Sequence, residues 1–265
     1  MDDAATTPTP KPVARCRPLA ALGRVLRAPA LIALLWVLQL ALAKLAAMAP
    51  RAAATAAMGD WRWFDDGHRM RALVELFADN PAVIAAVVGS LMSTSIIAAM
   101  FSVVTAPAII ARLDARRRFT ELCGACARYL GPMLVQSGYG LIFRALCTGL
   151  AVLPAKLIGP GALPLFFLFA AFPVLVLDRA RTAVVLEEAR PYHPMTFLRA
   201  IVDVARRPLW WLSGALIDTA KIAVGIAALL FIVSHDLGAA GIWIARLAGL
   251  LALMLGMWRV SLARL

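Results

Sequence analysis

The apolar residues of this chain are gathered into long stretches, which short polar segments separate. A helix of roughly 20 apolar residues spans the hydrocarbon core of a bilayer, because an α-helix rises 1.5 Å per residue. The pattern predicts about six such spans. They lie near residues 29–48, 81–111, 130–153, 157–177, 209–232 and 237–258. We therefore predict an all-α fold, a polytopic membrane helix bundle with a six-helix transmembrane domain over residues 29–265.

Composition supports this class of protein. Apolar residues make up 62% of the 265 residues and charged residues only 16%, with a mean hydropathy of +0.82. A soluble domain of this size could not bury so much apolar surface in one core. The prediction is thus that most of the chain faces lipid.

The basic residues indicate how the spans are oriented. About two thirds of the 27 Lys and Arg residues fall on one side of the predicted membrane, and short loops rich in Lys and Arg stay in the cytoplasm. Both termini are therefore predicted to be cytoplasmic, with residues 1–28 as a disordered basic tail. The net charge of +12 follows from this asymmetry and does not require nucleic acid. A cleaved secretory signal at the first span remains an alternative.

Two longer segments lie outside the predicted spans. The outer one includes "GDWRWFDDGH", whose aromatic residues are typical of a lipid headgroup boundary. Its Asp65, Asp66 and His68 suggest a metal site, but a turn explains Asp-Asp-Gly better. The inner segment, residues 178–208, is predicted to form two amphipathic helices broken at Pro191 to Pro194. In the second of them Phe197, Ile201, Val204 and Ala205 would face the inner leaflet.

The inner segments also suggest an internal repeat. "RLDARRR" (112–118) and "VLDRART" (176–182) each follow a predicted span. Further on, Phe119, Ala127, Arg128 and Leu134 match Phe197, Ala205, Arg206 and Leu212 at one offset. Two hairpin units would explain this pattern, and chance remains an alternative.

These segments carry a resemblance to a known group of proteins. "RFTELCGACARYLGPML", "LVLDRARTAVVLEEAR" and "FLRAIVDVARRPLWWLSGAL" resemble uncharacterised bacterial multi-pass membrane proteins. That group is loosely akin to the non-catalytic membrane domain of some glycerophosphodiester phosphodiesterases. The similarity covers roughly residues 110–215, and no phosphodiesterase domain accompanies it. It implies a bacterial cytoplasmic (inner) membrane location and a shape, but no activity.

Four charges inside the spans are the candidate site: Arg144, Asp218, Lys221 and Arg246. A charge at the centre of a membrane helix costs about 2.5 to 3.5 kcal/mol, so it usually faces the bundle and pairs. We predict that Asp218 pairs with Arg246, because each lies roughly 14 Å from one end of two antiparallel neighbouring spans. Lys44 lies near a span end and is expected to snorkel toward the headgroups.

Arg144 and Lys221 then lack a carboxylate, and two interpretations stay open. They could snorkel or donate to backbone carbonyls, so that the charges only lock helices together. Alternatively, they could form a basic pocket for an anionic group, either a lipid phosphate or an acidic solute.

Catalytic motifs are weak. Glu187-Glu188 lacks histidines in the spans that an intramembrane protease would need, because His68, His193 and His235 all lie in loops. Cys123 and Cys126 form a lone CxxC, which favours free thiols over zinc. We therefore expect no catalytic residue, no metal and no cofactor.

The sequence thus favours a non-enzymatic scaffold or subunit of a larger bacterial inner-membrane assembly. A permease or lipid-handling protein with a basic intramembrane pocket is the alternative. The expected partners are the lipid bilayer, anionic lipid and other membrane proteins, and nucleic acid is not expected.

Overall fold

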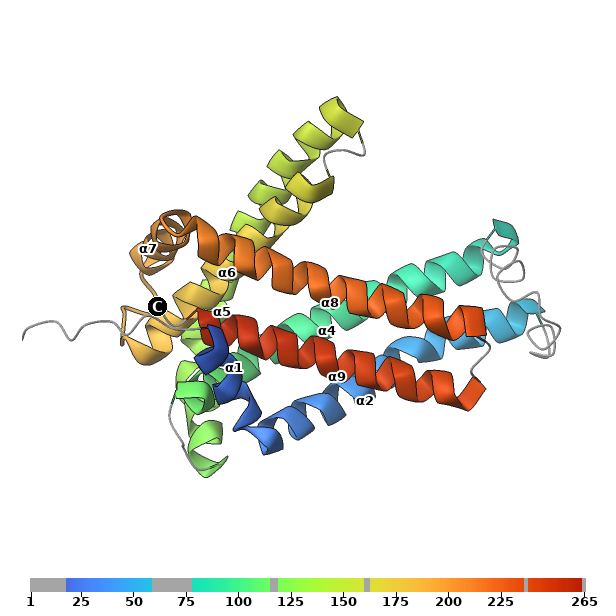
Figure 1. Ribbon diagram of the computed structural model, residues 1–265, viewed down its shortest axis with the longest axis horizontal. Coiled ribbons are helices and arrows are strands. Elements are labelled where there is room, and N and C mark those ends of the chain that lie inside the picture. Colours follow the sequence, from blue (N-terminus) through green and yellow to red (C-terminus); the bar gives the residue numbers. More distant parts are fainter. Residues whose placement is uncertain (1–17, 59–77, 115–118, 160–162, 236–237, 264–265) are drawn as a thin grey trace, which may run out of the picture.

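The computed structural model describes residues 18–58, 78–114, 119–159, 163–235 and 238–263, and helices joined by short irregular segments are the only regular secondary structure in this part of the chain. Eight helices are present in these ranges (Figure 1). They are α1 (Pro18–Leu26), α2 (Pro29–Met58), α4 (Pro81–Asp114), α5 (Phe119–Ile158), α6 (Leu163–Leu186), α7 (Pro194–Ala205), α8 (Pro208–His235) and α9 (Gly238–Leu262). The all-α prediction is confirmed for the described residues.

Proline marks where many of these helices begin. Pro18, Pro29, Pro81, Pro194 and Pro208 are each the first residue of a helix. Proline suits this position because its φ is already helical and the first N–H of a helix has no partner within that helix. At α7 the preceding residue, His193, also caps the helix, since its Nδ1 accepts from the backbone N–H of Met195 at 3.1 Å.

Among the described residues, four helices are long and apolar enough to cross a membrane, namely α2, α4, α8 and α9. They coincide with predicted spans one, two, five and six, and Figure 1 shows them side by side with roughly aligned axes, the chain direction alternating between α8 and α9. Predicted span three lies within α5, whereas predicted span four begins at the end of α5 and continues in α6 after residues 160–162, which are not described. α5 and α6 form a hairpin that leans away from α8 at a steep angle (Figure 1). The structure supports a membrane protein, whereas the number of six spans remains a prediction.

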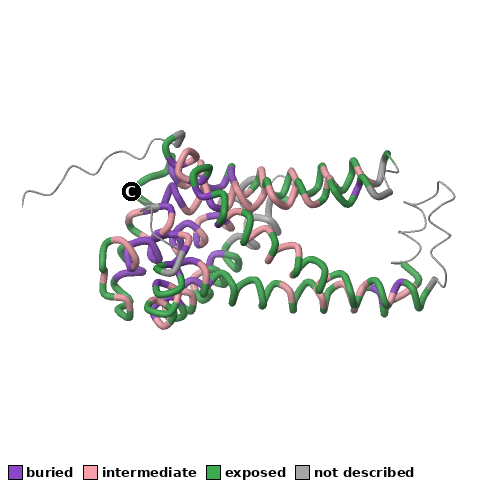
Figure 2. Tube along the Cα trace, turned by 90° about the horizontal axis from the view of Figure 1, so that it is seen from below, coloured by how far each residue is buried: buried purple, intermediate pink, exposed green. Residues whose placement is uncertain are grey.

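The buried core lies at one end of the molecule. Figure 2 shows that buried residues gather near the C-terminal end, whereas the far halves of the long helices are mostly exposed. The core side chains come from α1, α6, α7, α8 and α9: Ala21, Leu175, Val176, Ala180, Phe197, Val204, Trp210, Ile217 and Leu262. α6 and α8 approach closely at Gly214, where a Cβ atom would lie 2.6 Å from the Leu175 side chain. This end holds the helices together, and the exposed apolar halves suit lipid contact.

The structure corrects the predicted tail. Residues 1–17 lie outside the described residues, but Pro18–Leu26 forms the helix α1, so the disordered tail predicted for residues 1–28 is wrong from Pro18 onward. Ala21 and Val25 of this helix are fully buried. An apolar pair at this spacing lies on one face of a helix, which explains why α1 folds onto the bundle.

The inner amphipathic helices also differ from the prediction. Asp178, Arg179 and Arg181 belong to the last turns of α6 and not to a separate helix. The second helix exists as α7, and Figure 1 shows it nearly end-on, across the ends of the long helices. Its Phe197 and Val204 pack in the protein core and do not face a leaflet. An apolar stripe along one helix face suits a protein core and a lipid surface equally, so the sequence pattern cannot distinguish the two.

Two further predictions meet different outcomes. The segment that matches α7 and α8 in the suggested repeat is one continuous helix, α5, so the described structure does not show two equal hairpin units. The outer residues Asp65, Asp66 and His68 lie outside the described residues, as do the aromatic residues before them.

Candidate functional site

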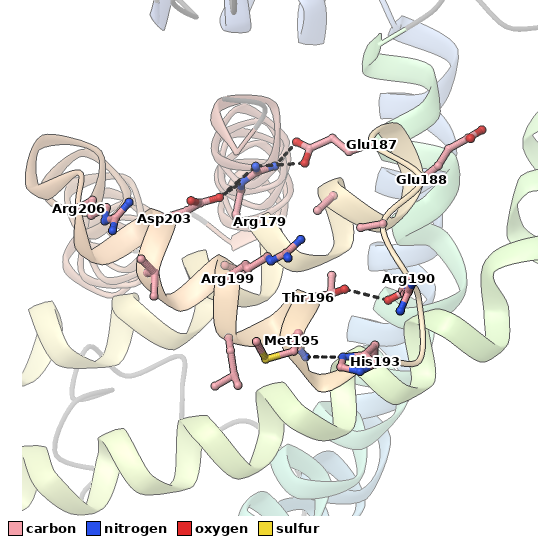
Figure 3. A pocket seen from close by; sticks show the side chains of 15 residues that line it. Arg179, Glu187, Glu188, Arg190, His193, Met195, Thr196, Arg199, Asp203 and Arg206 are labelled. Carbon is pink, nitrogen blue, oxygen red and sulfur yellow. Dashed lines mark hydrogen bonds and ion pairs between the residues drawn. The ribbon is translucent and has the colours of Figure 1, made fainter. Parts of the chain in front are cut away.

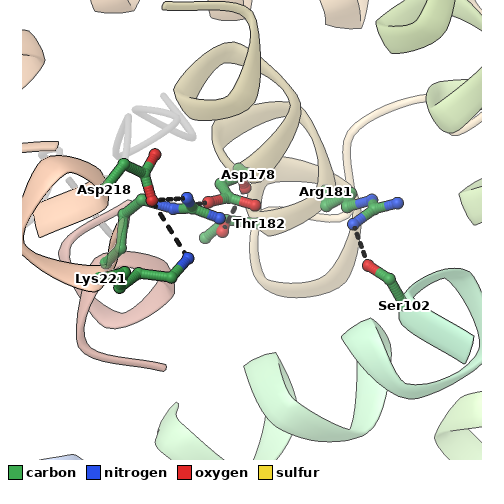
Figure 4. A network of polar contacts seen from close by, with 7 residues as sticks. Ser102, Asp178, Arg181, Thr182, Asp218 and Lys221 are labelled. Carbon is green, nitrogen blue, oxygen red and sulfur yellow. Dashed lines mark hydrogen bonds and ion pairs between the residues drawn. The ribbon is translucent and has the colours of Figure 1, made fainter. Parts of the chain in front are cut away.

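A charge network joins α6, α8 and α9 inside the bundle. The Arg259 guanidinium donates to Asp178 Oδ2 at 2.9 Å through Nε and to Asp218 Oδ1 at 2.5 Å. Lys221, one turn along α8, donates to the same Asp218 oxygen at 3.2 Å. Figure 4 shows Asp178 and Asp218 facing each other across this network, with Lys221 below. Two carboxylates thus hold Arg259 between two helices.

The predicted pair of Asp218 with Arg246 is wrong. The prediction misjudged the register of the α8–α9 hairpin. At a rise of 1.5 Å per residue, Arg246 lies about 13 Å closer than Asp218 to the loop that joins the two helices. Arg259 lies about one helical turn farther than Asp218 from that loop. Long side chains on a helix point back toward the N-terminus of the helix, so the Arg259 side chain reaches Asp218. Arg246 instead lies over the Trp243 ring at 4.9 Å.

Arg181, a second buried arginine, has no carboxylate partner among the described residues. It donates to Ser102 Oγ on α4 at 3.2 Å and to Ser137 Oγ on α5 at 2.7 Å, and the first contact is drawn in Figure 4. Its Nε makes no hydrogen bond to any residue that the structure describes. Only 6% of Arg181 is exposed. Because a guanidinium stays charged in proteins, this positive charge is neutralised only partly, by hydroxyl dipoles and the charge of Asp178 nearby.

Two pockets border this network. The first, which we call the bundle pocket, has a volume of about 320 Å³ and lies among α2, α4, α6, α8 and α9. Its polar lining consists of Gln39, Ser102, Asp178, Arg181, Lys221 and Arg259, and its remaining lining is apolar apart from Gly256. The second, which we call the hairpin pocket, has a volume of about 340 Å³ and lies between α5, α6 and α8. Lys221 and Arg259 line both pockets, so the network separates them.

Three of the four predicted site residues come together. Arg144, Asp218 and Lys221 line the hairpin pocket, and Arg246 lines neither pocket. Sequence reasoning missed Asp178, Arg181 and Arg259, because the predicted spans ended at residues 177 and 258 and charges beyond them were interpreted as orienting charges. One signal was present: "TAVVL" continues the apolar pattern after Arg181, which indicates that the helix does not end at Asp178.

A third pocket lies beside α7, and we call it the α7 groove. It has a volume of about 830 Å³. Arg179 forms ion pairs there with Glu187, which follows α6, and with Asp203 of α7 at 3.1 Å (Figure 3). Arg190, Arg199 and Arg206 also line the groove, and their side chains form no ion pair with the described residues. Arg179 therefore links α7 to α6, whereas the other three arginines have no acidic partner among the described residues.

The described residues contain no group of three His, Cys, Asp or Glu side chains that could hold a metal ion. Cys123 and Cys126 are free thiols near the start of α5. Burial raises the pKa of the Cys126 thiol above its ordinary value, which disfavours the reactive thiolate. The absence of an enzymatic activity stays a prediction.

Comparison of the chain with models of known protein families, with curated proteins and with solved structures found no match. The resemblance to bacterial multi-pass membrane proteins stays a prediction. The geometry of the charge network and its pockets is therefore the basis for any proposal about function.

Proposed function

We propose that this chain is a multi-pass protein of a bacterial inner membrane that binds, and either carries or presents, an anionic amphiphile at the charge network. This is the lipid-handling alternative of the sequence analysis. The role of scaffold or assembly subunit stays a prediction.

The charge balance of the network supports this proposal. Within the described part of the chain, three cations, Arg181, Lys221 and Arg259, adjoin only two carboxylates, Asp178 and Asp218. One positive charge is therefore unmatched inside an apolar bundle, where a free charge is costly. A bound anion would balance it.

The surroundings of the network favour an amphiphile over a small hydrophilic solute. The bundle pocket has a charged floor and mainly apolar walls, such as Leu35, Ile109 and Leu253. Beyond the network, α4 and α8 expose large apolar side chains, including Leu91, Met100 and Leu229. A ligand with one anionic end and a hydrocarbon part matches both regions.

The positions of the helix ends support a membrane orientation with both chain termini in the cytoplasm. α1, α7 and the end of α9 lie at the same end of the molecule (Figure 1), together with many of the arginines outside the spans. Arginine-rich ends belong on the cytoplasmic side. We therefore propose cytoplasmic termini and six crossings, of which α5 and α6 form the third and fourth.

The function is tested by measuring which lipids remain bound after extraction. Wild-type protein, Lys221→Met and Arg246→Met are extracted from bacterial membranes in a mild detergent, and their lipids are quantified by native mass spectrometry. We expect anionic phospholipid to be enriched on the wild type and about tenfold less bound by Lys221→Met, the effect of losing one charge-assisted contact of about 1.5 kcal/mol.

Arg246→Met is the matched control, because Arg246 is also an intramembrane cation but lines neither pocket. It should bind lipid like the wild type. Equal loss in both variants, or no preference of the wild type for anionic over zwitterionic lipid, would contradict the proposal. A stable set of copurifying subunits with no enriched lipid would favour the scaffold role instead.

A further inference from the structure

We propose that Arg181 is the principal ligand of a singly charged phosphate ester, which binds in the bundle pocket with Ser102 and Lys221 as its neighbours. This inference rests on the proposed function and names the ligand class and a binding residue. The shared chemistry is a phosphate group, and its source is either a phospholipid headgroup or a soluble phosphate.

The burial of Arg181 without an acid is the first argument. Asp178, the nearest acid along α6, already accepts from Arg259, and no carboxylate pairs with Arg181 in the described residues. Arg179, only two residues away, pairs with both Glu187 and Asp203. A cation as buried as Arg181 needs such compensation, so its absence points to a missing anion.

The donors that remain are the second argument. A guanidinium has five N–H donors, and the two serines accept two of them. Ser137 donates its own hydroxyl hydrogen to the Met133 carbonyl at 2.5 Å, so it can only accept from Arg181. Ser102 makes no other hydrogen bond in the described structure and lines the bundle pocket, so its hydroxyl can donate to an anion there. Serines from two helices thus fix the guanidinium plane and leave donors for the ligand.

The pocket selects the class of anion. Arginine presents N–H donors in a planar fork that matches phosphate oxygens. Lys221 lines the same pocket from α8, and its ammonium can rotate toward a ligand while Asp218 keeps its contact with Arg259. The single unmatched positive charge favours a phosphodiester over a doubly charged phosphomonoester. At about 320 Å³ the pocket is near the lower end of small-molecule sites, so it fits a headgroup, and acyl chains would extend outside it.

The inference is tested by ligand binding to the purified full chain in a neutral detergent. The probes are short-chain phosphatidylglycerol, short-chain phosphatidylcholine and inorganic phosphate, and binding is followed by the shift in apparent Tm. The variants are Arg181→Gln, Arg181→Lys, Ser102→Ala and Lys221→Met, with Arg246→Gln as the control.

We expect phosphatidylglycerol to bind the wild type and the control equally. Its Kd should rise at least about tenfold in Arg181→Gln, as for the loss of a bidentate charged contact, and about threefold in Ser102→Ala. Ser102→Ala removes a single hydroxyl and keeps the inference testable if Arg181→Gln does not fold. Arg181→Lys should bind more weakly than the wild type because lysine lacks the fork.

The outcomes separate this inference from the proposed function. If Lys221→Met loses phosphatidylglycerol but the Arg181 and Ser102 variants keep it, the proposed function stands and the inference is overturned. If inorganic phosphate alone binds, and does so through Arg181, Arg181 is a phosphate ligand, but the ester named in the inference and the amphiphile are both overturned. If no probe binds the wild type, both are rejected. If phosphatidylcholine, whose phosphate also carries one negative charge, binds as well as phosphatidylglycerol and does so through Arg181, the inference holds and the anion preference of the proposed function is rejected.

Discussion

Glu188 has a backbone conformation that is unusual for its residue type. It follows the end of α6 with a φ of 52°, in the left-handed region. The backbone N–H groups of Glu187 and Ala189 both donate to the Ala183 carbonyl, at 3.1 and 3.2 Å, which closes the helix end. Such an end usually carries glycine, because a Cβ in this region costs roughly 1 to 2 kcal/mol.

We therefore predict that Glu188→Gly stabilises the protein by about 1 kcal/mol. The expected measurement is a rise of about 2 °C in apparent Tm in mild detergent. Glu188→Gln is the control, since it removes the same charge but keeps the Cβ and should leave Tm unchanged. An equal rise in both variants would attribute the gain to charge and contradict backbone strain.

At the scale of elements, the ion pair between Arg179 and Asp203 joins α6 to α7, whose Phe197 and Val204 also pack in the core. Arg179 is almost buried on α6 and contacts Asp203 of α7, which is about 40% exposed. We predict that Asp203→Asn weakens the attachment of α7 by about 1 kcal/mol, a value reduced by this exposure. Amide hydrogen exchange should then be about fivefold faster in residues 194–205, while α8 and α9 stay unchanged.

Arg199→Gln is the matched control for this prediction. Arg199 lies on the same helix and lines the same groove, but it forms no ion pair with the described residues. Its variant should exchange like the wild type. If Asp203→Asn leaves exchange in α7 unchanged, packing of Phe197 and Val204 alone holds the helix.

At the scale of the whole molecule, the proposed orientation places the start of α5 on the cytoplasmic side. Cys123 is exposed there. In a variant with Cys123 as its sole cysteine, we predict no reaction with a membrane-impermeant maleimide in intact spheroplasts and complete reaction after permeabilisation. The reagent adds only to thiols that it can reach from outside. Complete labelling of intact spheroplasts would reverse the orientation.

The apolar pattern by itself determined much of this protein. It predicted an all-helical chain and the four helices α2, α4, α8 and α9, because a bilayer demands long apolar runs whose backbone polar groups are satisfied internally. It also identified Arg144, Asp218 and Lys221 together with Arg246 as costly charges inside apolar runs, and the first three line one pocket whereas Arg246 does not.

Tertiary structure alone decided which charges meet. Asp218 pairs with Arg259 and not with Arg246, because the register of the α8–α9 hairpin places Arg246 about 13 Å away along the axis. The continuation of α6 past Asp178 buried Arg181, which the sequence places at a membrane edge. The local sequence pattern indicates how apolar each helix is. Which charged side chains pair depends on the relative shift and tilt of separate helices, and packing between distant segments sets both.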